Sequence, residues 1–205
     1  MLGWLQTCFD TEGVTLWESC RTVISQEGRW TMEAKDVVLD ALDRIRSILH
    51  RTLAGLTLDE IHRQPRPDTN SIAWLTWHLT RVQDNGISGL FDQEQAWISQ
   101  GWHAKFAMEP DPDNEGQGHT PEQVAAFHAA SVQLLLDYHD SVSTRSKAFV
   151  GSLAAAGFDR QLNEPHYQPV PTVGVRLVSI LSDNLQHAGQ TAYLRGVWQG
   201  IGWRS

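Results

Sequence analysis

The segment from Val173 to Trp198 constrains the fold of this chain most strongly, because it reads as one long helix. It contains no proline, and its apolar residues lie around most of the circumference of a helix. A helix that is apolar on nearly every side is normally covered by other elements. We therefore expect this helix to be enclosed by the rest of the domain.

Three further segments show the spacing of amphipathic helices. The first shows this spacing from Val38 to Leu53 and is closed by Gly55; the capping-box sequence TLDE at 57–60 then predicts a short helical turn. The second begins at a cap on Asn70 or Ser71, and the third begins at TPEQ (120–123) and continues to residue 157 at the latest. No stretch alternates as a strand, so the sequence predicts an all-α four-helix bundle.

Residues 92–119 connect the second and third predicted helices as a long loop rich in glycine, proline and aspartate. Loops of this length in compact domains are often lids or binding loops. Trp97, Trp102 and Phe106 are candidates for contact with an apolar ligand. In a chain with nine tryptophans, packing is the more frequent role for such residues. The loop histidines, His119 among them, receive no role.

The first 31 residues differ from the rest. They show no sustained period and contain both cysteines, Cys8 and Cys20. We expect the bundle to span residues 32–205 and residues 1–31 to form an appendage. An extra helix lying on the domain is an equally open alternative.

Charge and composition exclude several classes of protein. A net charge of −8 without any Lys/Arg-rich run argues against a nucleic-acid partner, and no apolar run approaches the ~20 residues of a membrane span. The N-terminus lacks the pattern of a secretory signal. Two cysteines without a CxxC pair indicate neither a disulfide framework nor a cysteine zinc site, so the reducing cytoplasm is the expected compartment.

Three polar side chains interrupt the long final helix on one face. Asp183, His187 and Gln190 are spaced four and three residues apart. A buried carboxylate requires a basic partner, hydrogen-bond donors or a metal ion. Aspartate and histidine one turn apart can converge on one divalent ion.

A catalytic metal site of this kind needs a third ligand, and His78 is the first candidate, since it lies at the edge of the apolar stripe of the second helix. His128 and His139 are weaker candidates, because they lie ~16 Å apart along the third helix and cannot share one ion. The plainer alternative is a site without metal. Asp183 then pairs with His187 alone, or with Arg176 or Arg81.

From about Met32 to Trp198, the chain resembles the DinB/YfiT-like superfamily of four-helix proteins, which includes mycothiol-dependent maleylpyruvate isomerases and bacterial thiol S-transferases. The resemblance rests on NSIAWLTWHLTRVQD (70–84) and VRLVSILSDNLQHAGQTAYLRG (175–196). It implies that His78, in its Trp-His-Leu context, and Asp183 and His187, ahead of Gly189-Gln190, bind a divalent metal. Asp183 departs from the family pattern, in which histidine or glutamate is usual, and leaves the identity of the metal open.

The resemblance also implies an activity. A zinc or nickel ion would hold a low-molecular-weight thiol, such as mycothiol or bacillithiol, as the thiolate that attacks an electrophilic small molecule. Neither cysteine of the chain is needed for this transfer. Arg81 is expected to bind an acidic group of thiol or substrate, unless it pairs with Asp84. Gln190 is expected to bind a metal-bound water or to fix the tautomer of His187.

Two other classes of function remain open at the level of sequence. One is a non-catalytic, stress-related or ligand-binding bundle in which the metal is structural or absent. The other is a hydrolase that uses a metal-bound hydroxide, for which the sequence offers no well-placed general base. A monomer and a homodimer are both open.

Overall fold

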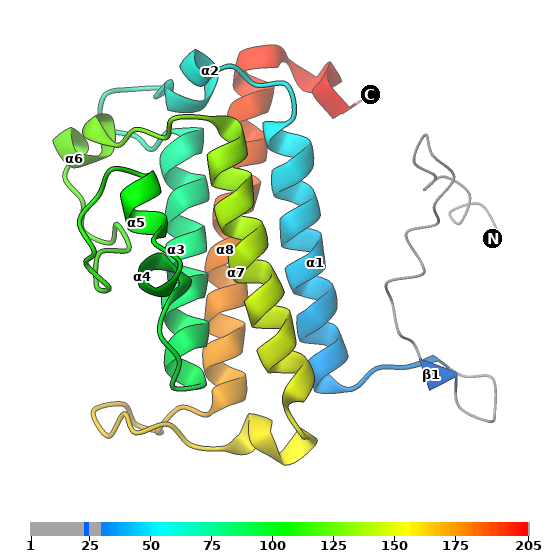
Figure 1. Ribbon diagram of the computed structural model, residues 1–205. Helices are drawn as coiled ribbons and strands as arrows, with labels where there is room; N and C mark the ends of the chain where they lie inside the picture. Colours follow the sequence, from blue (N-terminus) through cyan, green and yellow to red (C-terminus); the bar gives the residue numbers. More distant parts are fainter. Residues whose placement is uncertain (1–22, 25–29, 205) are drawn as a thin grey trace.

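Figure 1 shows the computed structural model of the protein, which describes residues 23–24 and 30–204. Four long helices form a bundle, as the periodicity of the sequence predicts, and shorter helices lie in the connections. The helices and turns, in chain order, are α1 (Ala34–Leu53), α2 (Leu58–His62), α3 (Ile72–Leu90), α4 (Ala96–Ser99), α5 (Trp102–Lys105), α6 (Pro121–Ala126), α7 (Val132–Ser152), η1 (Ala155–Asp159), α8 (Val173–Gln199) and η2 (Ile201–Arg204).

Little of the N-terminal segment belongs to the described residues. Val23–Ile24 and Trp30–Thr31 form the two-residue strands β1 and β2, which pair antiparallel before α1 begins. Cys8, Cys20 and the alternatives predicted for residues 1–31 as a whole lie outside the described residues.

The helix starts follow the predicted caps. Ser71 caps α3, where its hydroxyl accepts from the amide of Trp74 at 3.2 Å. Thr57 and Glu60 form the predicted reciprocal capping box at α2. In the part of the chain that is described, no helix combines the length and the apolar character needed to cross a bilayer.

The prediction of one continuous third helix is wrong, because the structure divides this segment into α6 and α7. The backbone amide of Ala129, in the break, donates to Nε2 of His62 on α2 at 3.0 Å, and Ala129 is fully buried. Ser131 then restarts the helix by accepting from the amide of Leu134 at 2.9 Å. A tertiary contact and a new cap therefore divide a segment whose periodicity alone looks continuous.

The direction of the helices explains the long connection before α7. Helices α1 and α8 run one way, whereas α3 and α7 run the other way (Figure 1). Because α3 and α7 are parallel, the chain must travel back along the bundle between them. The returning segment, 92–119, packs Trp97, Trp102 and Phe106 into the core, which confirms packing as the role of these aromatic residues.

The enclosed helix is α3, not α8. Of the 19 residues of α3, 15 are buried, because α7, α8 and the returning segment surround it. Helix α8 packs against α1 and α3 but leaves one side uncovered, where Val175, Val178 and Tyr193 are exposed. The prediction that α8 is enclosed is therefore wrong: its apolar residues face solvent on that side as well as the core.

Candidate metal centre

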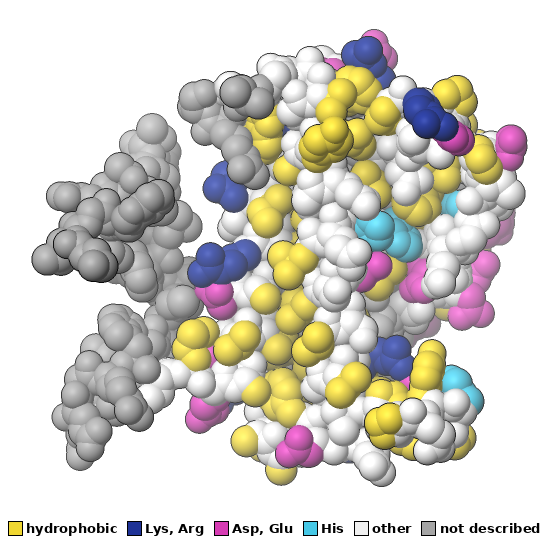
Figure 2. Space-filling model, turned by 180° about the vertical axis from the view of Figure 1, so that it is seen from behind, with side chains coloured by type: hydrophobic (Ala, Val, Ile, Leu, Met, Phe, Trp, Pro, Cys, Tyr) yellow, Lys and Arg dark blue, Asp and Glu magenta, His cyan; other side chains and the backbone are white. Residues whose placement is uncertain are grey.

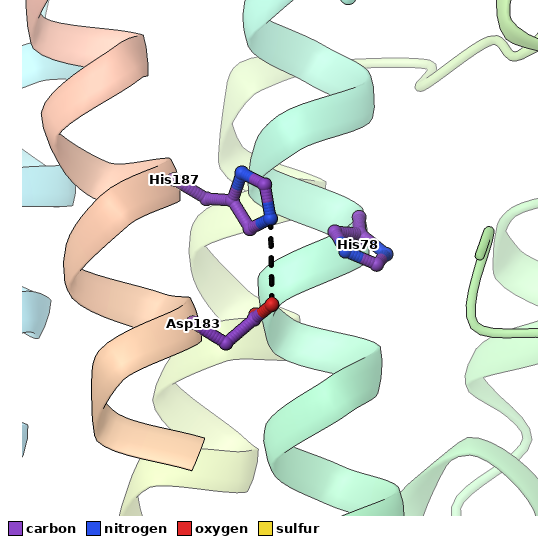
Figure 3. A group of neighbouring side chains, drawn as sticks. All are labelled: His78, Asp183 and His187. Atoms are coloured by element: carbon purple, nitrogen blue, oxygen red, sulfur yellow. Dashed lines mark ion pairs between the residues drawn. The ribbon is translucent and has the colours of Figure 1, made fainter. Parts of the chain in front are cut away.

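The structure brings the three predicted ligands together between α3 and α8. His78 projects from α3, and Asp183 and His187 project from successive turns of α8 toward the same space (Figure 3). One potential ligand atom from each residue lies within 4.8 Å of the others. His78 is buried, and the two α8 residues are half-buried, so the centre borders the surface. His128 and His139 are not members of this cluster.

Gln190 fixes the ring of His187, as predicted for one of its two possible roles. Nδ1 of His187 lies 2.8 Å from Oε1 of Gln190, one turn along α8. Because the amide oxygen accepts, Nδ1 carries the proton in this bond. The other ring nitrogen, Nε2, lies 3.4 Å from Oδ1 of Asp183 and offers its lone pair to an ion when it is deprotonated.

A backbone carbonyl fixes the ring of His78 in the same way. Nδ1 of His78 donates to the carbonyl oxygen of Glu115 at 2.5 Å. A carbonyl cannot donate, so the proton of the neutral imidazole stays on Nδ1 and the lone pair stays on Nε2. Both histidines are thus held in the tautomer that leaves Nε2 free, the arrangement found around metal-binding histidines.

Asp183 has the unfilled bonding capacity that a metal ligand requires. Its Oδ2 is buried and has no hydrogen-bond partner among the described residues. The two arginines considered as alternative partners are engaged elsewhere: Arg176 pairs with Glu164, and Arg81 pairs with Asp84. Since a buried carboxylate oxygen without a donor is costly, a cation at this point would satisfy it. The residues present fit a divalent metal.

The pKa values of the two histidines shift in opposite directions. Burial lowers the pKa of His78, which favours the neutral ring that can bind a metal. The hydrogen bond to Asp183 raises the pKa of His187 against the opposing effect of burial. A proton therefore competes with a metal ion at His187, and we expect metal affinity to fall as the pH falls.

The long loop supplies parts of the site that sequence reasoning missed. Gly116 follows Glu115 at φ +92°, and the ring of Trp74 stacks on His78 with centroids 4.8 Å apart. Trp74 also donates from Nε1 to Nδ1 of His119 at 3.2 Å. Glycines at 116 and 118 mark the loop in the sequence, but no local signal indicates that it returns to a histidine 37 residues earlier.

Arg81 does not serve as the predicted ligand-binding residue. Its side chain is fully buried, so a small molecule from solvent cannot contact it. Its guanidinium donates to the carbonyls of Asn114 and Pro112 at 3.1 and 2.8 Å, and to Oε1 of Gln95 at 2.8 Å. Arg81 instead attaches the returning segment to α3, one turn after His78.

A cavity of about 520 Å³ lies beside this segment, but it is not the mouth of the metal centre. It is bordered by Phe106, Phe127 and His119, and none of the three predicted ligands lines it. The ring of Trp74 lies between His119 and His78. We therefore assign the cavity no part in the chemistry.

The fold and the site together define a class of protein: a four-helix bundle with a candidate mononuclear metal centre of two imidazoles and one carboxylate. Three protein ligands leave further positions for water or a small molecule, as in catalytic sites. The family model described as the DinB superfamily matches residues 41–191, so the chain belongs to the DinB superfamily.

A solved structure supports the same assignment. The crystal structure described as a conserved protein from Enterococcus faecalis is 32% identical in sequence and superposes with a TM-score of 0.75. The match covers 82% of this chain and 98% of that one. No curated protein matched the chain.

Proposed function

We propose that the protein is a metal-dependent transferase that joins a low-molecular-weight thiol to an electrophilic small molecule. The observation that carries the proposal is the convergence of His78, Asp183 and His187 at one point, with both imidazoles held in the tautomer that leaves Nε2 free. Membership of the DinB superfamily supports a metal at this point. A cytoplasmic location suits the proposal, because small thiols stay reduced there.

The three side chains would hold a zinc or nickel ion, which suits a mixed set of imidazole and carboxylate ligands. When bound, the ion would supply a positive charge that lowers the pKa of a coordinated thiol below its usual ~8.5. In the overall transfer, the thiol sulfur forms a bond to the electrophilic carbon while the bond from that carbon to its leaving group breaks. The leaving group departs with the bonding electron pair, and the thiol proton is released to solvent.

The surrounding residues keep the two imidazoles ready for this task. Gln190 and the carbonyl of Glu115 orient the rings, and Trp74 covers one face of His78. Asp183 would offer a carboxylate charge to the ion, and without metal its Oδ1 lies 3.4 Å from Nε2 of His187. Because Asp183 and His187 are half-buried at the edge of the bundle, a thiol from solvent has access to the centre.

Metal analysis of the purified chain, without an affinity tag that binds metal, tests the first part of the proposal. We expect about one equivalent of zinc or nickel in the wild type, and loss of this metal in His187→Ala, because the ion then keeps only two protein ligands. His128→Ala is the matched control. His128 is exposed and outside the cluster, so this variant should keep its metal.

The transfer itself is tested on the metal-loaded protein with a sugar thiol and a chromogenic alkylating agent. We expect thiol consumption that is faster than the spontaneous rate in the wild type and in His128→Ala, and reduced to the spontaneous rate in His187→Ala. Stoichiometric metal without any rate increase, over a panel of thiols and electrophiles, would favour the non-catalytic bundle. Absence of metal from folded wild-type protein would exclude the metal centre altogether.

A further inference from the structure

The uncovered side of α8 is unusual because it carries no charge. Helix α8 contains Arg176, Asp183, His187 and Arg195, but all four are only partly exposed. Arg176 pairs with Glu164 in the preceding connection, Asp183 and His187 face α3, and Arg195 donates to carbonyls of α1. The exposed positions, which we call the α8 face, are Val175, Val178, Ser179, Ser182, Leu185, Gln186, Gly189, Gln190, Tyr193, Val197 and Gln199. In a chain with 20% charged residues, an uncharged face over the length of a helix requires an explanation.

Large apolar side chains concentrate on this face. Five of the nine exposed large hydrophobic residues among the described residues belong to it, with exposed fractions from 44% at Leu185 to 72% at Tyr193. They follow one another at spacings of 3, 7, 8 and 4 residues, so they form a single stripe. Figure 2 shows hydrophobic side chains running along the middle of this side of the molecule.

The stripe has the form of a helix-packing surface. From Val175 to Val197 it extends ~33 Å at 1.5 Å per residue. Ser182 and Gly189 lie along it, and a Cβ added at Gly189 would meet no atom within 4 Å. Small residues between large ones allow another helix to approach closely, and charge depletion with an exposed tyrosine is typical of the centre of an interface.

We propose that the α8 face is the interface of a homodimer, in which α8 of a second copy packs against α8. Two chains of charge −8 repel each other, and the α8 face is where they can meet without bringing like charges together. A two-fold axis places the same patch on both sides, and a stripe that is uncharged along its whole length does not repel its own copy.

Other occupants fit the face less well. Attachment to an anionic membrane depends on Lys and Arg on the polar borders, whereas this face has no exposed cation. The length of the stripe, ~33 Å, suits packing against α8 of a second copy along most of the helix.

The dimer would also affect access to the metal centre. Asp183 and His187 lie on the border of the α8 face, and the exposed Leu185 lies between them along the helix. A second copy would therefore lie beside the open side of the centre and restrict the shape of a small molecule that reaches it. The dimer does not depend on the proposed function, because no residue of the stripe is a predicted ligand.

Sedimentation equilibrium of the full chain tests the dimer directly. We expect a mass of twice 23.0 kDa for the wild type, and half of that mass for Tyr193→Glu and for Val178→Glu, since each variant buries two charges at the interface. Leu58→Glu is the matched control. It makes the same kind of change at an exposed leucine, 43% accessible, at the start of α2.

Each outcome supports or overturns the interface. A monomeric wild type with an intact circular-dichroism spectrum overturns it, and cosedimentation of that monomer with phosphatidylcholine vesicles would assign the face to lipid. A dimer that persists in Tyr193→Glu and Val178→Glu uses another surface and also overturns it. Metal content measured on the same samples separates the two proposals, because a monomeric variant that keeps its metal affects only the dimer.

Discussion

Gly116 is the residue on which the geometry of His78 most depends. It stands next to the carbonyl that fixes the imidazole, at a backbone angle of φ +92° that only glycine adopts easily. A Cβ at this position would lie 2.8 Å from Cζ3 of Trp77 and 2.9 Å from Cζ2 of Trp74. Both rings are buried, so neither can move aside.

We expect Gly116→Ala to lower the free energy of unfolding by ~2–5 kcal/mol, the sum of backbone strain and overpacking. It should also weaken metal binding, because the displaced loop carries the carbonyl of Glu115. Gly118→Ala is the control: its φ is +79°, yet nothing lies within 4 Å of the added Cβ, so only the strain remains. Urea denaturation and metal titration check both variants, and equal effects would contradict this account.

At the scale of elements, the returning segment 92–119 acts as a support for α3. Asp84 of α3 accepts from the first two amides of α4, Ala96 at 2.9 Å and Trp97 at 2.7 Å. Tyr138 of α7 donates to the same carboxylate at 3.0 Å. Arg81 holds the other end of the segment, so side chains of α3 attach the loop at both ends and position the carbonyl of Glu115.

We expect Arg81→Lys to weaken zinc affinity by ~10-fold or more, the usual effect of losing an indirect support of a metal ligand. An ammonium cannot reproduce the forked contacts to Pro112 and Asn114, so the neighbouring Glu115 would shift. Calorimetric zinc titration measures the change. Arg145→Lys is the control, because Arg145 donates to the carbonyl of Glu94 at the far end of the loop. If Arg81→Lys binds zinc as tightly as the wild type does, Arg81 does not position the carbonyl of Glu115.

At the scale of the whole molecule, the bundle encloses a histidine that does not belong to the candidate metal centre. His139 on α7 is fully buried, and burial lowers its pKa to about 4. Its Nδ1 lies 3.3 Å from the hydroxyl of Thr80, which itself donates to the carbonyl of Thr76. Nδ1 therefore donates to Thr80, and Nε2 lacks a partner among the described residues. Protonation of Nε2 would place an unpaired charge in the core.

This burial predicts that the fold loses stability in acid. The unfolded chain binds a proton at His139 below pH ~6.5, whereas the folded chain does so only near pH 4, so stability falls as the pH drops through this window. Over the whole window His139 lowers the free energy of unfolding by ~3 kcal/mol, because each unit of pKa difference between the folded and unfolded chain is worth about 1.36 kcal/mol. Urea denaturation from pH 7 to 4, in chelator, measures it. His139→Leu should lack this part of the slope, and a parallel decline in both proteins would contradict the prediction.

Much of the site could be predicted because its spacing is local. Asp183, His187 and Gln190 lie on one helix, and the helical repeat alone places them on one face. The same holds for the caps at Thr57 and Ser71. Arg81 could not be assigned in this way, because two of its partners are backbone carbonyls of a loop more than 30 residues away. A buried arginine and an exposed one have the same sequence signature.

The sequence by itself determined the four-helix class, the boundaries of α8 and the shared face of Asp183, His187 and Gln190, because periodicity, caps and turn spacing are set by neighbouring residues. His78 was a candidate third ligand on its position in α3 and on the resemblance to the family. Only the tertiary structure decided which helix is enclosed, where the third helix breaks, and which carbonyl fixes His78. These features depend on the path of the returning segment and on contacts between residues far apart in the chain, and those contacts leave no local pattern.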